Sequence, residues 1–118
     1  MLFDPRIIDA VARARQWSSF LSMLLQREPE MAAMLENGVL PELHSLARDL
    51  ADMPTPRRLR LERRRLALRV AIGDLAGCDD LTAVTHALSD FADRALDSAI
   101  VTADRKSTRL NSSHGKLS

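Results

Sequence analysis

Residues 56–77 read PRRLRLERRRLALRVAIGDLAG. The run opens with Pro56, which suits the first turn of a helix, and closes with Gly77, a common residue just after a helix C-terminus. The leucines, alanines and arginines between them have high helix propensity. At about 100° per residue the apolar side chains fall on two nearly opposite faces: Leu61, Leu68, Ile72 and Leu75 on one, Leu59, Leu66 and Val70 on the other. We therefore expect 56–76 to be the longest helix of the chain, sandwiched between partners.

Proline, glycine and capping residues divide the N-terminal part into shorter helices. Asp4-Pro5 is a typical helix start, and the apolar stripe that follows ends at Glu28, with a break expected near 17–19 where a serine can begin a second helix. A short helix is expected from Pro29 until Asn37-Gly38 stops it. Another is expected to begin at Pro41, with one apolar face: Leu43, Leu46, Ala47 and Leu50.

A final helix is expected after Gly77. Asp79 or Asp80 should cap it, and its apolar stripe runs from Leu81 to Ala99. β-branched residues form no alternating runs, so no strand is expected. The predicted fold class is all-α, an array of about five to six helices.

Several classes of site are disfavoured by composition. Cys78 is the single cysteine, expected in a turn between helices, and the three histidines have no metal-ligand spacing. The sequence contains no nucleophile elbow, no phosphate-cradling glycine loop and no HExxH or CxxC motif. No apolar run approaches the ~20 residues of a membrane span. We expect a cytoplasmic chain with no catalytic residue, no metal site and no cofactor of its own, and no membrane partner.

Charge is distributed unevenly along the chain. Seven arginines and one glutamate give residues 57–69 a net charge of +6, whereas the rest of residues 1–103 sums to −8. The arginines can pair with acidic neighbours and cover apolar surface with their stems, or they can contact a phosphate or nucleotide. Nucleic-acid binding is disfavoured because the body is acidic and no aromatic residues interleave with the arginines. The candidate phosphate-binding or structural arginines are Arg60, Arg63, Arg64, Arg65 and Arg69.

The arginine-rich run also carries a family resemblance. Residues 59–77 read LRLERRRLALRVAIGDLAG, which resembles the LRxFRRRxxLRIAxxDLxG segment of the bifunctional glutamine synthetase adenylyltransferase/adenylyl-removing enzymes. Weaker similarity extends upstream to 17–30 and downstream to Ala99, so it spans most of residues 1–103. One departure is Glu62, where that family usually has an aromatic residue.

The resemblance implies a function for a parent protein. In that family a helical stretch of this kind precedes a nucleotidyltransferase domain, where an Asp-x-Asp pair holds Mg²⁺ against the phosphates of ATP. It also implies glutamine synthetase and a nitrogen-signalling regulatory protein as partners. Residues 1–103 would be the helical N-terminal region of the adenylyl-removing half. The fragment itself is expected to be inactive, because it contains no Asp-x-Asp pair. The alternative is a non-catalytic helical interaction module whose basic helix binds an acidic partner.

The last residues have an unusual composition. Residues 104–114 read DRKSTRLNSSH, which is similar to the in-frame translation of a sequencing-library adapter. We therefore expect 104–118 to be a non-native tail, and the natural coding sequence to continue differently after Ala103. Gly115-Lys116-Leu117 imitates part of the family's catalytic motif, and we interpret it as chance.

Overall fold

The computed structural model describes residues 3–115, with side chains described through Arg105. Within this range the chain forms five α-helices and two short 3₁₀ helices and contains no strand, so the predicted all-α class is confirmed. The α-helices are α1 (Pro5–Trp17), α2 (Ser19–Arg27), α3 (Pro29–Glu36), α4 (Thr55–Ala76) and α5 (Leu81–Gly115); the 3₁₀ helices are η1 (Leu43–Ser45) and η2 (Arg48–Leu50).

The caps that separate α1, α2 and α3 are those expected from the sequence. The Asp4 carboxylate accepts a hydrogen bond from the Arg6 N–H at 2.9 Å and so begins α1. Ser18 interrupts the first stripe in extended conformation, and its hydroxyl accepts from the Leu21 N–H at 3.1 Å to begin α2. After α3, Gly38 has a φ of 78°, which lets its N–H bond the Leu35 carbonyl and turn the chain.

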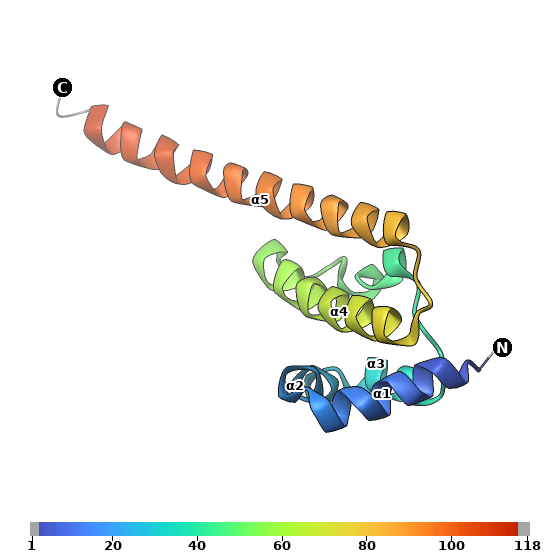
Figure 1. Ribbon diagram of the computed structural model, residues 1–118. Helices are drawn as coiled ribbons and strands as arrows, with labels where there is room; N and C mark the ends of the chain where they lie inside the picture. The colour runs from blue at the N-terminus through green and yellow to red at the C-terminus, as the bar shows by residue number, and fades with distance from the viewer. Residues whose placement is uncertain (1–2, 116–118) are drawn as a thin grey trace. The chain divides into compact units, whose positions relative to one another are not determined.

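The arginine-rich helix α4 is the centre of the fold. It packs against α1 and α2, and Figure 1 shows it lying over the layer that α1, α2 and α3 form. Leu66 and Leu68 lie about 160° apart around the helix and are both buried, so the expectation of a helix covered on two sides is confirmed. Gly77 ends the helix with a φ of 67°.

Two predictions about helices are wrong. The segment from Pro41 to Leu50 forms η1 and η2 rather than an α-helix. Its backbone is engaged elsewhere: the Ser45 hydroxyl donates to the Glu42 carbonyl, and the Leu46 carbonyl accepts from Arg65 of α4. The longest helix is α5 with 35 residues, compared with 22 in α4, because no proline or glycine stops it before Gly115.

The chain divides into two compact units, and α5 crosses the division. The first, Met1–Leu88, contains the main core, whose largest fully buried side chains come from α1, α2, α3 and α4: Ile7, Leu25, Leu35, Leu68 and Ile72. The second, Ser89–Ser118, contains the rest of α5. The predicted domain boundary after residue 103 falls inside α5 and stays a prediction; the last three residues of the expected tail lie outside the described part.

Candidate functional site

Arg65 is the centre of a polar network on α4. Its guanidinium donates to the Asp49 carboxylate through two nitrogens, at 2.7 and 3.2 Å, and to the Leu46 carbonyl at 2.8 Å. Its Nε donates to the Glu28 carboxylate at 3.3 Å. These bonds use four of the five N–H donors of the guanidinium, which therefore ties α4 to the 3₁₀ segment and to the α2–α3 junction.

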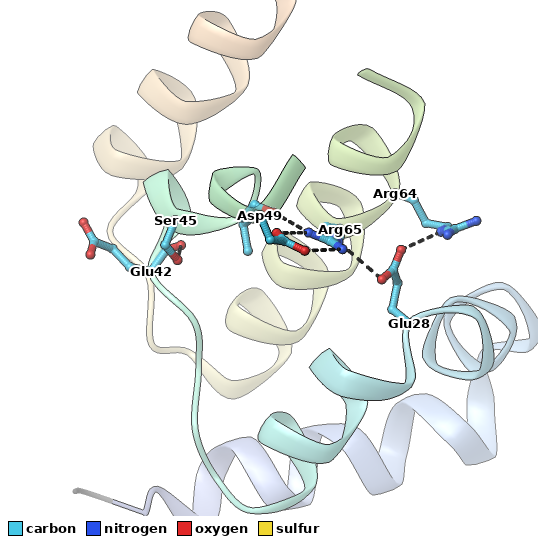
Figure 2. A network of polar contacts seen from close by, with 7 residues as sticks. Glu28, Glu42, Ser45, Asp49, Arg64 and Arg65 are labelled. Carbon is cyan, nitrogen blue, oxygen red and sulfur yellow. Dashed lines mark hydrogen bonds and ion pairs between the residues drawn. The ribbon is translucent and has the colours of Figure 1, made fainter. Parts of the chain in front are cut away.

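Glu28 connects two successive arginines. One of its oxygens accepts from Arg64 Nε at 2.8 Å and the other from Arg65, as Figure 2 shows. The Glu28 side chain is only 10% exposed, so the two guanidinium groups supply the polar contacts that water would otherwise provide. The acid that ends α2 in sequence is therefore an internal anchor for α4.

Arg69 forms a second, deeper ion pair. Its guanidinium donates to the Asp79 carboxylate at 2.7 Å and to the Pro41 carbonyl, and the two side chains are 8% and 11% exposed. Asp79 or Asp80 was expected to cap the last helix, and Asp80 is the residue directly before α5. The Asp79 carboxylate closes the α4–α5 turn onto α4, because the turn at Gly77 brings it beside Gly73, one turn along α4 from Arg69.

The five candidate arginines thus separate into two groups. Arg64, Arg65 and Arg69 are committed to carboxylates and carbonyls of the fold, as the ion-pair interpretation expected. Arg60 and Arg63 are exposed, and within the part of the chain with described side chains neither guanidinium forms a hydrogen bond or ion pair. The structure therefore does not bring all five together at one site.

Arg65 also changes the ionisation of its partner. The hydrogen bonds that it donates hold the pKa of Asp49 below its ordinary value, and those bonds raise the pKa of the Arg65 guanidinium in turn. The Asp49 side chain is 63% exposed, so solvent screens much of this interaction. Both groups are charged at neutral pH.

The same network borders a pocket of about 490 Å³. Its lining residues come from α3, from the segment around η1 and from the network. Arg65, Glu28 and Asp49 are the lining residues that belong to the network. The remaining lining residues are Pro29, Glu30, Met31, Met34, Pro41, Ser45 and Leu46.

Among the residues with described side chains, no group of three or more His, Cys, Asp or Glu side chains is placed to hold a metal ion. Cys78 lies in the α4–α5 turn, as expected, with its thiol 3.7 Å from an Asp4 carboxylate oxygen, and burial raises its pKa. Glu62, which stands where the resembled family has an aromatic residue, is buried.

The acidic partners were missed by sequence reasoning. Glu28 was interpreted only as a helix end and Asp79 only as a cap, while Asp49 was not singled out at all. The one available signal was the charge imbalance, which required acids elsewhere in the body to face the arginines without saying which.

None of the described helices is long and apolar enough to cross a membrane. Comparison of the chain with protein-family models, with curated proteins and with solved structures finds no match.

Proposed function

We propose that this chain is the helical, non-catalytic part of a cytoplasmic nucleotidyltransferase that adenylylates and deadenylylates glutamine synthetase. The single observation behind this proposal is the arginine-rich segment at 59–77, whose order of arginines, leucines and final glycine resembles that family. Mg²⁺, ATP and a nitrogen-signalling regulatory protein belong to the proposed parent. The chain described here would contribute a scaffold to that enzyme.

The residues that carry the resemblance also stabilise the fold around α4, which supports the proposal. Leu68 is fully buried, Arg65 and Arg69 bind the surrounding segments, and Gly77 adopts a positive φ that other residues rarely tolerate. A pattern with such roles would be retained wherever this helical arrangement is retained. These structural roles support the proposed scaffold, whereas the proposed adenylyl transfer and removal rest on the sequence resemblance alone.

The alternative is a helical interaction module that binds an acidic partner. Its support is the exposed arginines of α4: the side chains of Arg57, Arg60 and Arg63 form no hydrogen bond or ion pair within the range of described side chains. An arginine fork held in water is available for carboxylates or phosphates of another molecule. This function would need no downstream domain.

Genomic DNA distinguishes the two proposals. The first predicts that the natural reading frame continues after codon 103 into a glycine-rich loop followed by an Asp-x-Asp pair. The purified parent should then remove AMP from adenylylated glutamine synthetase with Mg²⁺ and phosphate, while residues 1–103 alone should show no turnover. A natural stop codon close to 103 would overturn the enzyme proposal.

Binding to a model polyanion tests the alternative. The chain should bind polyglutamate with an affinity that falls as salt is added, and the double change Arg60→Gln and Arg63→Gln should weaken that binding. The matched double change Arg6→Gln and Arg13→Gln also removes two positive charges, from α1, where Arg6 pairs with Asp4 and Arg13 with Asp9, each at 2.9 Å, and should weaken it less. Equal losses in both variants would mean that α4 has no special role.

A further inference from the structure

The pocket beside the arginine network has two chemically different sides. Met31 and Met34 of α3 and Leu46 after η1 give it aliphatic walls, and Met34 is 40% exposed. Methionine is flexible and polarisable, so it adapts to apolar groups of varied shape. The volume of about 490 Å³ lies within the range of about 300–1,000 Å³ that is usual for ligand pockets.

The polar side of the pocket has an excess of carboxylates. Glu28, Glu30 and Asp49 face a single lining arginine, Arg65. That arginine already donates four hydrogen bonds to protein oxygens, so an incoming anion would have to compete with Glu28 and Asp49 for it. An anionic ligand is therefore disfavoured here.

A cationic ligand is favoured in the same pocket. Glu30 is exposed at the first turn of α3, and its carboxylate forms no hydrogen bond or ion pair with any described side chain or backbone group. The Asp49 carboxylate binds Arg65, but the Asp49 side chain is 63% exposed, so each of its oxygens retains a lone pair toward solvent. The pocket thus offers acceptors beside an aliphatic wall.

We propose that this pocket binds a basic side chain, lysine or arginine, presented by an apolar segment of a partner protein. The aliphatic stem of that side chain would pack on Met31, Met34 and Leu46, and its charged head would reach Glu30 and the open side of Asp49. Charge complementarity selects this occupant over an acidic segment. The site is separate from the exposed arginine face of α4 and does not depend on the proposed enzymatic function.

The test uses the full chain with ¹³C-methyl methionine. The probe is a short peptide in which lysines alternate with leucines, and its counterpart has glutamate in place of lysine. The lysine peptide should shift the methyl signals of Met31 and Met34 in a saturable way, with a Kd below about 1 mM, and leave Met23 and Met53, which do not line the pocket, unchanged.

Two variants and one control locate the binding. Glu30→Gln should weaken the peptide about two- to fivefold, the usual worth of one exposed ion pair. Glu42→Gln removes the same charge from a nearby residue that does not line the pocket, and should leave the affinity unchanged. Met34→Lys places a tethered ammonium four residues after Glu30 and should lower the affinity more than tenfold by filling the site.

Four results would overturn the proposal: no saturable shift at Met31 and Met34, equal binding of the glutamate peptide, equal weakening by Glu30→Gln and Glu42→Gln, or unchanged binding by Met34→Lys. Equally tight binding of free 1,5-diaminopentane would replace the peptide partner by a small amine. Circular dichroism of each variant verifies that the helices are retained.

Discussion

Removing the Arg65 side chain is the most direct test of how α4 is held in place. Arg65→Ala deletes the hydrogen bonds to Glu28, Leu46 and Asp49 together. The change leaves α4 itself intact, because alanine has the highest helix propensity of any residue. Any loss of stability therefore reports the tertiary contacts.

The magnitude follows from how exposed each abandoned partner is. Asp49, 63% exposed, can be hydrated again, so its lost ion pair should matter by less than about 1 kcal/mol. Glu28 is 10% exposed and the Leu46 residue is buried. Removing one partner of a buried ion pair typically destabilises by about 3–5 kcal/mol. Because Glu28 keeps Arg64, we expect the low end of that range, about 3 kcal/mol.

Urea denaturation followed by helical circular dichroism measures this loss. Arg60→Ala is the matched control: it removes an arginine from the same helix at an exposed position with no described partner, and should change the free energy of unfolding by less than about 0.5 kcal/mol. Arg65→Lys, which keeps the charge but loses the fork, should fall between the two. A loss below about 1 kcal/mol for Arg65→Ala, or an equal loss for Arg60→Ala, would show that the Arg65 contacts do not hold α4 in place.

Three further experiments test other parts of the first unit. Gly38→Ala should destabilise the fold far more than Gly77→Ala. Both residues have a positive φ, which costs alanine roughly 1–2 kcal/mol. A Cβ at Gly38 would also meet a backbone nitrogen at 2.8 Å, whereas a Cβ at Gly77 meets nothing within 4 Å. Similar unfolding midpoints in urea would contradict this. Alkylation of Cys78 by iodoacetamide at pH 8 should be slower in the folded chain than in urea, because burial raises the pKa of the thiol; equal rates would show an open thiol. Arg65 lowers the pKa of Asp49 in the folded state, so the ionised carboxylate adds stability above its unfolded pKa of about 4 that disappears as the pH falls through the lower folded value. The stability difference between the wild type and Asp49→Asn should therefore be present at pH 6 and vanish in strong acid, and a constant difference would exclude the ion pair as its cause.

Helix ends were the most predictable feature of this fold. Each helix end depends on groups only a few residues apart in the sequence. Asp4 and Ser18 accept a backbone hydrogen bond through a side-chain oxygen, and Gly77 adopts a positive φ. The two-sided burial of α4 was predictable for a similar reason, since Leu66 and Leu68 are separated by the fixed rotation of the helix.

The segment 41–50 shows where local reasoning stops. Its leucines have the spacing of a helical face, yet Arg65, which binds the Leu46 carbonyl, is 19 residues away along the chain. No local pattern reveals that a distant guanidinium competes for a backbone acceptor. The partners of the arginines were unpredictable for the same reason: Glu28 lies 36 residues from Arg64.

The network also changes which arginines can serve a ligand. For Arg65 or Arg69 to contact a phosphate, the guanidinium would have to release Asp49 or Asp79 and leave a carboxylate facing the incoming anion. Arg60 and Arg63 need release nothing, because both are already in water. The arginines facing inward therefore hold the helix in its layer, and Arg60 and Arg63 are exposed to solvent. Substitutions at Arg64, Arg65 and Arg69 should therefore lower the stability of the fold. Substitutions at Arg60 and Arg63 should instead change the binding of a ligand.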